Sequence, residues 1–156
     1  MLQWAMATML MAAAVPAPMS DWVFVDGDGE YSMLTYVDTD SFEDESANHV
    51  SALSYTVRAE DSEQGAAAYM VRAEYDCTGS RSRILAIKVF DASKNILLDS
   101  SDGDDWTPVQ PNTVNASLLT FVCSKGKSET DPVSTGSEPP FDISRQIMRE
   151  QRNKKQ

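Results

Sequence analysis

Apolar and polar residues alternate over several short segments in the middle of the chain. A period of two places alternate residues on one face of a β-strand, and in residues 69–76 these are Tyr69, Val71, Ala73 and Tyr75. Similar segments lie at 22–25, 31–37, 50–58, 82–90 and 96–98. The short connections between them favour antiparallel neighbours, so the pattern predicts an antiparallel β-sheet meander. Within residues 82–90 the same rule predicts one shared face for Leu85, Ile87 and Val89.

A helical period follows the predicted strands. Apolar residues recur at intervals of three and four at Val114, Leu118, Phe121 and Val122, which is the spacing of one helix face. Asn112 or Thr113 provides an N-cap, and Cys123 stands at the end of the pattern. We therefore expect an α+β fold, in which the antiparallel meander is covered on one face by one C-terminal helix.

The two cysteines fit this arrangement. Cys77 follows the predicted strand at 69–76, and Cys123 ends the predicted helix. In an exported protein an even pair predicts a disulfide, which would tie the helix to the sheet. A loop of this length gives roughly 4 kcal/mol of stabilisation in the chain-entropy model. The alternative is two buried free thiols.

The first segment has the character of an export signal. Residues 1–19 carry no charge, an apolar run covers residues 6–15, and small residues precede Ala17. This composition predicts a signal peptide over residues 1–17, although no Lys or Arg precedes the apolar core. The alternatives are an uncleaved membrane anchor and a buried apolar helix. After cleavage the protein would have no integral membrane span. We expect it to be exported to the periplasm or the cell surface.

Composition divides the rest of the chain into a domain and a tail. We assign residues 18–127 to one domain, because the predicted strands and helix lie there. Residues 124–144 are rich in Ser, Thr, Pro, Gly and acidic side chains, as flexible linkers are. Residues 128–156 are therefore predicted to form a flexible polar tail, with a short basic helix at 145–149.

The net charge and the residue composition argue against several classes of function. With 13 Lys and Arg against 24 Asp and Glu, the net charge of −11 argues against nucleic-acid binding. One His and two Cys are too few for a Cys/His zinc site. Phosphate-loop, serine-hydrolase and zinc-protease motifs are absent from the sequence. We expect no cofactor and no enzyme activity, the alternative being a hydrolase with paired carboxylates.

Two acidic runs with glycine are candidate calcium sites. They cover residues 26–30 and 102–105. Neither has the spacing of an EF-hand loop, which ends in a distal bidentate Glu. Asp and Gly are also the usual residues of tight turns. We interpret both runs as turns and predict no metal site, with weak calcium binding as the alternative.

Five segments occur in an order that resembles a known family, and they lie at 36–42, 75–77, 90–91, 106–111 and 118–123. Over residues 21–124 the chain resembles the surface-adhesin protein E family of Gram-negative bacteria. The resemblance implies a small antiparallel sheet with a C-terminal helix tied on by a disulfide. It also implies an exported, non-catalytic module that binds host extracellular-matrix and serum proteins.

The family's binding function is ascribed to a basic strand region that contains aromatic residues, and its nearest equivalent here is residues 81–95. Our candidate binding residues are Arg81, Arg83, Lys88 and Trp106. For the two arginines the alternative is pairing with Glu74 or Asp76 on the neighbouring strand; for Trp106 it is a core position.

The chain also departs from the family, because its body is acidic and no Cys follows the signal for lipid attachment. The expected partner is a protein, either of the host extracellular matrix or of the periplasm. The alternative function is a periplasmic accessory or inhibitor-like protein without a host-binding role. The oligomeric state stays open.

Overall fold

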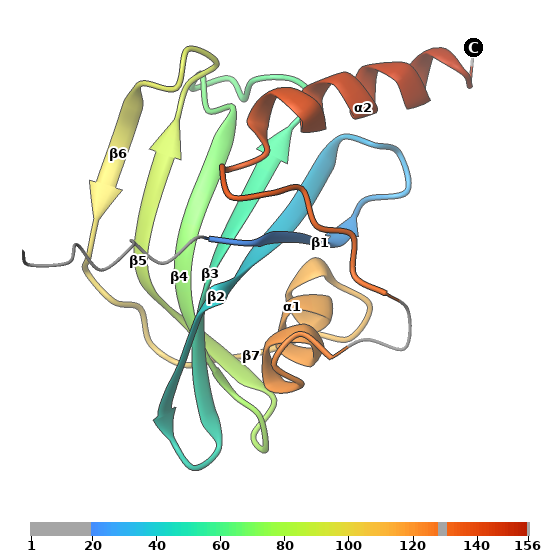
Figure 1. Cartoon of the computed structure of the whole chain (residues 1–156). Coiled ribbons are helices and arrows are strands. Elements are labelled where there is room, and N and C mark those ends of the chain that lie inside the picture. Colours follow the sequence, from blue (N-terminus) through green and yellow to red (C-terminus); the bar gives the residue numbers. More distant parts are fainter. Residues whose placement is uncertain (1–19, 128–130, 156) are drawn as a thin grey trace, which may run out of the picture.

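The computed structural model describes residues 20–127 and 131–155 (Figure 1). A meander of antiparallel strands forms the sheet, in the order in which they follow one another in sequence. The strands are β1 (Trp22–Gly27), β2 (Met33–Ser46), β3 (His49–Arg58), β4 (Ala68–Asp76), β5 (Arg81–Phe90) and β6 (Ile96–Ser100). A short seventh strand, β7 (Thr107–Pro108), also pairs with β5. The predicted meander is confirmed, whereas the predicted signal peptide at 1–17 lies outside the described residues.

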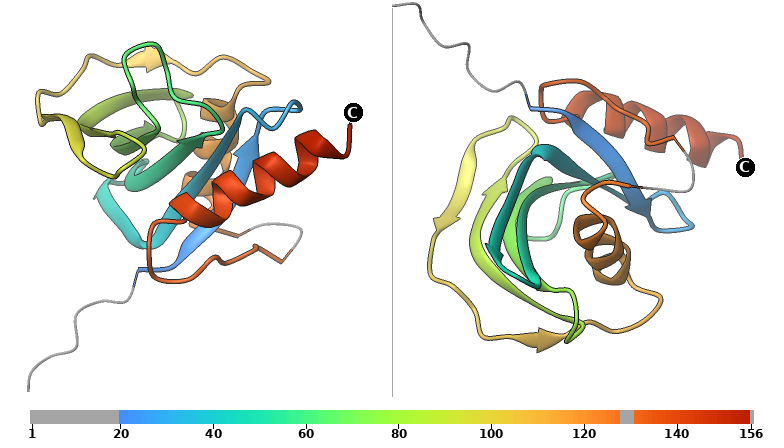
Figure 2. Two further views of the ribbon diagram at one scale, coloured as in Figure 1. Left: turned by 90° about the horizontal axis from the view of Figure 1, so that it is seen from above. Right: turned by 60° about the horizontal axis from the view of Figure 1, so that its bottom comes forward.

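Two helices lie on opposite sides of the sheet. The helices are α1 (Val114–Cys123) and α2 (Phe141–Asn153). β2 to β5 are strongly curved, and α1 lies against the inner side of their curve (Figure 2). Leu118, Phe121 and Val122 of α1 pack on one apolar cluster, which includes Val37 and Tyr75. The predicted helix and its cap are confirmed, since the Thr113 side chain accepts a hydrogen bond from the Ala116 amide.

The second helix corrects the predicted architecture. The prediction of a single C-terminal helix tied by the disulfide was wrong, because the tied helix is α1 and α2 follows it. Phe141 and Met148 of α2 are buried in the cluster on the other sheet face, against Tyr36, Tyr55 and Val57. Two apolar residues seven positions apart lie on one face of a helix. They anchor a segment that is otherwise mostly polar.

The region predicted as a flexible polar tail thus contains an ordered element. The short helix expected at 145–149 lies inside α2. Before α2, the backbone amides of Trp22 and Phe24 donate hydrogen bonds to the carbonyls of Gly136 and Val133. The domain boundary at residue 127 itself stays a prediction.

A β-bulge changes the predicted face pattern of β5. Arg72 pairs with Ala86 and Ala73 with Ile84, which leaves Leu85 as the extra residue. A bulge of this kind reverses the alternation beyond it. Ile84, rather than Leu85, therefore lies on the same face as Ile87 and Val89.

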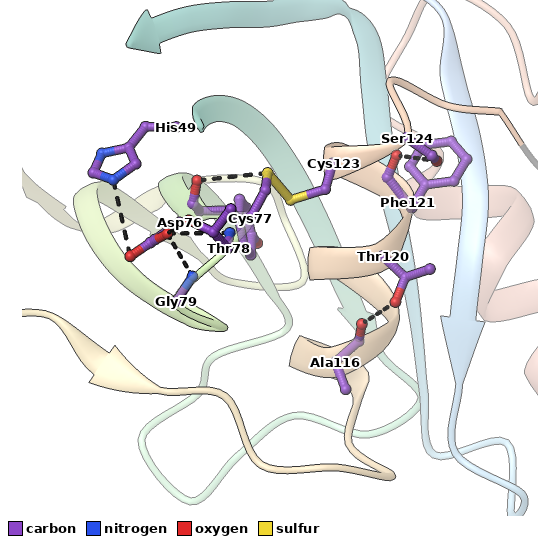
Figure 3. The surroundings of a disulfide bond; sticks show 11 residues. His49, Asp76, Cys77, Thr78, Gly79, Ala116, Thr120, Phe121, Cys123 and Ser124 are labelled. Carbon is purple, nitrogen blue, oxygen red and sulfur yellow. Dashed lines mark hydrogen bonds and ion pairs between the residues drawn. A yellow bond between two sulfur atoms is a disulfide. The ribbon is translucent and has the colours of Figure 1, made fainter. Parts of the chain in front are cut away.

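The predicted disulfide is confirmed. Cys77 and Cys123 are bonded, with their Cα atoms 5.6 Å apart. Figure 3 shows the bond joining the residue after β4 to the last residue of α1. It fixes α1 to the end of the sheet at which β4 turns into β5. No helix within the described ranges is long and apolar enough to cross a membrane.

Candidate functional site

The sheet face that α2 packs on is divided along the strands into an apolar and a polar half. Beneath α2 the strands present apolar side chains to the core. At the other end, β3, β4 and β5 present charged and polar side chains. The register pairs His49 with Asp76, Asp76 with Arg81, and Glu74 with Arg83. Because cross-strand partners lie on the same face, these five side chains form one group.

Two buried carboxylates form the base of this group. Glu74 and Asp76 are each only 4% exposed. Arg83 donates to Glu74 Oε2 from Nε at 2.8 Å and from Nη2 at 2.6 Å, and His49 Nδ1 lies 2.9 Å from Glu74 Oε1. Burying a carboxylate is costly unless cations and hydrogen bonds compensate its charge. The two side chains beside Glu74 supply that compensation.

Asp76 also organises the turn between β4 and β5. Arg81 donates to Asp76 Oδ2 from Nη2 at 2.7 Å and from Nε at 3.2 Å. The backbone amides of Thr78 and Gly79 donate to Oδ1 at 3.2 and 2.7 Å. The Arg81 guanidinium, followed by the Gly79 amide, holds the pKa of Asp76 well below its usual range. The carboxylate therefore stays ionised and keeps the guanidinium in place.

Gly79 is required at this turn because the backbone approaches the carboxylate closely. A Cβ at position 79 would lie 2.8 Å from the Asp76 Cγ carbon, in conflict with the hydrogen-bonded side chain. The turn thus depends on a small residue, as turn positions beside a hydrogen-bonded Asp often do.

Trp106 lies over the two arginines. The guanidinium carbons of Arg83 and Arg81 are 4.9 and 5.4 Å from its ring centre. The imidazole ring of His49 contacts it edge to face, with ring centres 5.0 Å apart. Trp106 is half-buried and directly precedes β7, which pairs with the start of β5. We call Trp106, Arg81, Arg83, His49 and the two carboxylates beneath them the Trp106 cluster.

The guanidinium groups are fixed but still accessible. The Arg81 and Arg83 side chains are 47% and 39% exposed, whereas their carboxylate partners are almost fully buried. A planar guanidinium held from below by a carboxylate and stacked on an indole ring loses few rotamers when a partner binds. The cluster is therefore a preorganised cationic and aromatic surface.

A second polar network borders the cluster on the same face. Arg72 pairs with Glu43 of β2 at 2.6 Å and also donates to the Ser51 hydroxyl at 3.2 Å. Ser51 in turn donates to Glu45 at 2.7 Å. The end of β2 is exposed and acidic, so this network adds negative charge beside the guanidinium groups.

The structure brings together three of the four predicted binding residues. Arg81 and Arg83 both contact the Trp106 ring, whereas Lys88 lies farther along β5 and pairs with Asp99 of β6 at 3.1 Å. The alternative pairing of the arginines with Glu74 and Asp76 is present as well. His49 was missed as a member, because only the register between β3 and β4 places it beside Glu74.

The first acidic run that was a candidate calcium site spans the end of β1 and the turn that follows it, and the second lies in a loop. In the first, the Asp28 carboxylate accepts hydrogen bonds from the Ser32 and Met33 amides at 2.6 and 3.1 Å, which closes the β1–β2 turn. The second run lies between β6 and β7. Within residues 20–127 and 131–155, no three His, Cys, Asp or Glu side chains converge as metal ligands would.

The fold and the site define a class of protein: a small disulfide-bonded α+β domain with a preorganised surface cluster. A family model of surface-adhesin protein E matches residues 22–124, and the chain belongs to that family. Among solved structures, crystal form II of Haemophilus influenzae protein E is similar with a TM-score of 0.48 and 10% identity. That match covers 78% of this chain and 100% of the other. No curated protein gives a significant match.

Proposed function

We propose that the chain is an exported, non-catalytic binding module that acts by protein–protein contact through the Trp106 cluster. Membership of the surface-adhesin protein E family supports a binding role. The observation that carries the proposal is the indole ring flanked by two guanidinium groups, each held by a buried carboxylate. Trp and Arg are the residues most enriched at the energetic centres of protein interfaces.

The partner we propose is a host extracellular-matrix protein, with a periplasmic protein as the alternative. The charges around the Trp106 cluster suit a partner surface that carries both acidic and basic groups. The guanidinium groups suit a carboxylate or a carbonyl of the partner, whereas the acidic end of β2 suits a Lys or Arg beside it. The net charge of −11 would speed association with a basic protein at low salt.

The test compares capture of extracellular-matrix proteins and of periplasmic extract by the disulfide-bonded chain and its variants. Trp106→Ala removes the ring and leaves both arginine–carboxylate pairs intact, while Trp106→Phe keeps an aromatic ring. We expect Trp106→Ala to weaken binding of the captured protein at least about thirtyfold, the loss typical of an interface hot spot. Trp106→Phe should lose less.

Lys88→Ala is the matched control, since Lys88 is a cation on the same strand outside the cluster. It should bind as the unmodified chain does. Equal binding by Trp106→Ala and the unmodified chain would show that the contact lies elsewhere. Protease treatment of intact cells decides the location, because a surface protein is digested and a periplasmic protein is not.

A further inference from the structure

A cavity lies on the α1 side of the sheet, on the face opposite the arginine–carboxylate pairs of the Trp106 cluster. Its volume is about 270 Å³, and β3, β4, β5, α1 and the segment at 104–107 contribute to its lining. Ligand sites in proteins begin at about 300 Å³, so this cavity suits a molecule of only a few heavy atoms. Trp106 is part of the cluster on the other face, whereas its neighbours Asp105 and Thr107 line this cavity.

The lining has an excess of hydrogen-bond acceptors. The Ser54 hydroxyl donates its proton to the Val71 carbonyl at 3.3 Å, and the Thr107 hydroxyl donates to the Ser82 carbonyl at 3.2 Å. The Ser82 hydroxyl accepts from the Asn115 amide at 3.0 Å. Since the protons of Ser54 and Thr107 are committed, both present only lone pairs to an occupant.

Two carboxylates at the rim add negative charge. Asp104 and Asp105 line the cavity, and both are exposed. The Asp104 backbone amide donates to the Ile84 carbonyl at 2.8 Å, which holds the loop beside β5. In the part of the chain that the structure describes, no cation pairs with either carboxylate. Arg83 also borders the cavity, but its guanidinium is held by Glu74 on the opposite face.

Tyr75 is a buried polar side chain in the wall of this cavity. It is 2% exposed, and among the described residues no group forms a hydrogen bond with its hydroxyl. Burial raises the pKa of Tyr75, so the phenol stays protonated and can both donate and accept. The hydroxyl is therefore free to form a hydrogen bond with an occupant of the cavity.

We propose that this cavity binds a small organic ammonium ion, such as an alkylamine. An ammonium group has three donors and no acceptor, which is the complement of a lining rich in lone pairs. The rim carboxylates attract the cation, and the Tyr75 ring provides an aromatic surface for it. An anion would be repelled at the rim, and a neutral alcohol would offer the carboxylates one O–H donor without the charge attraction that an ammonium ion adds. This site is independent of the proposed protein contact.

The experiment titrates the disulfide-bonded chain with butylamine and 1,4-diaminobutane, and with 1-butanol as the uncharged probe. Calorimetry gives the affinity and stoichiometry, and amide chemical shifts locate the site. We expect both amines to saturate at one molecule per chain and to shift the amides of Ser54, Tyr75 and Thr107. 1-Butanol should give no saturable binding.

The double variant Asp104→Asn/Asp105→Asn should weaken amine binding about ten- to a hundredfold, as expected for lost charge-assisted hydrogen bonds. Its matched control is Asp102→Asn/Glu63→Gln, which removes the same charge from two exposed side chains outside the cavity. The control should bind as the unmodified chain does. Tyr75→Phe keeps the ring, removes the hydroxyl and should also weaken binding.

Three results would overturn the proposal. The first is the absence of saturation with either amine. The second is equal weakening in the control double variant, which would reduce the effect to net charge. The third is a set of shifted amides that leaves out Ser54, Tyr75 and Thr107. The capture experiment with Trp106→Ala tests the protein contact separately, because Trp106 does not line the cavity. Its outcome therefore has no bearing on these three results.

Discussion

At the scale of single residues, Asp76 determines the local structure around the site. One oxygen accepts from two backbone amides of the β4–β5 turn, and the other pairs with Arg81. The same side chain therefore shapes a turn and fixes a guanidinium beneath Trp106. Figure 3 shows it beside the disulfide, with His49 close by. The β4–β5 turn, the disulfide and the Trp106 cluster therefore meet around Asp76.

Asp76 should make the protein sensitive to acid. Its pKa is lowered from 3.8 in the folded protein. The stabilisation is present above the ordinary value and is lost as the pH falls through the lowered one, because the unfolded chain takes up the proton first. Between about pH 5 and pH 2 the free energy of unfolding should fall more steeply for the unmodified chain than for Asp76→Asn.

Urea unfolding at several pH values measures this slope. Asp99→Asn is the control, since Asp99 forms an exposed pair with Lys88 in the same sheet. Parallel slopes for the unmodified chain and Asp76→Asn would show that Asp76 is not the group responsible.

The Glu74–Arg83 pair should behave as a unit. Arg83→Leu alone leaves Glu74 buried, with the His49 imidazole as its remaining side-chain contact at 2.9 Å. We expect a loss of about 2 kcal/mol, less than the 3–5 kcal/mol of a fully buried pair because Arg83 is partly exposed and screened. Glu74→Leu/Arg83→Leu should lose less than the single variant. Denaturant unfolding of the double-mutant cycle tests this, and additive losses would contradict coupling.

At the scale of elements, a few apolar residues attach α2 to the sheet. Phe141 and Met148 are buried, and Ser144 between them hydrogen-bonds to the Tyr36 hydroxyl at 2.9 Å. The outer face carries ion pairs such as Arg152 with Glu60, which contribute little to stability. The helix therefore depends on packing rather than on charge.

Met148→Ala tests that dependence. The side chain is fully buried, so its truncation should cost about 2–4 kcal/mol of unfolding free energy. Ile143→Ala is the matched control in the same helix, because Ile143 is 44% exposed and should change stability little. Thermal or denaturant unfolding measures both, and equal effects would show that α2 does not contribute to the core as described.

At the scale of the whole molecule, the disulfide links two parts that are distant in sequence. It joins the end of β4 to the end of α1 across 46 positions. α1 covers one sheet face and α2 the other, and the α2 face also carries the Trp106 cluster. The disulfide and an apolar cluster attach α1 to its face, whereas α2 is attached to the other face through apolar packing.

Replacing both cysteines by serine should destabilise the protein by about 2–4 kcal/mol, chiefly through the added freedom of the unfolded chain. The expected result is a lower denaturant midpoint with a native-like circular dichroism spectrum before the transition. Treatment of the unmodified chain with a reductant should shift the midpoint by a similar amount. An unchanged midpoint in both experiments would contradict this role of the bond.

Local pattern by itself determined the meander, the position of α1 and the cysteine pair. Periods of two and of about 3.6 are local properties, and residues 69–76 and 114–122 display them clearly. The resemblance to the surface-adhesin protein E family, rather than a local pattern, selected Arg81, Arg83, Lys88 and Trp106 as candidates. The strand and helix periods depend on neighbours within a few positions, which is the range over which a sequence pattern is informative.

Only the tertiary structure decided the rest. The packing of α2 depends on Phe141 and Met148 meeting a surface formed more than eighty residues earlier by Tyr36 and Val57. His49 joins the cluster through strand register, and the bulge at Leu85 reverses the faces of β5. The acceptor-rich cavity exists because the loop at 104–107 runs along β5. Each of these depends on contacts between distant segments, whose geometry is fixed only when the sheet curves and both helices dock.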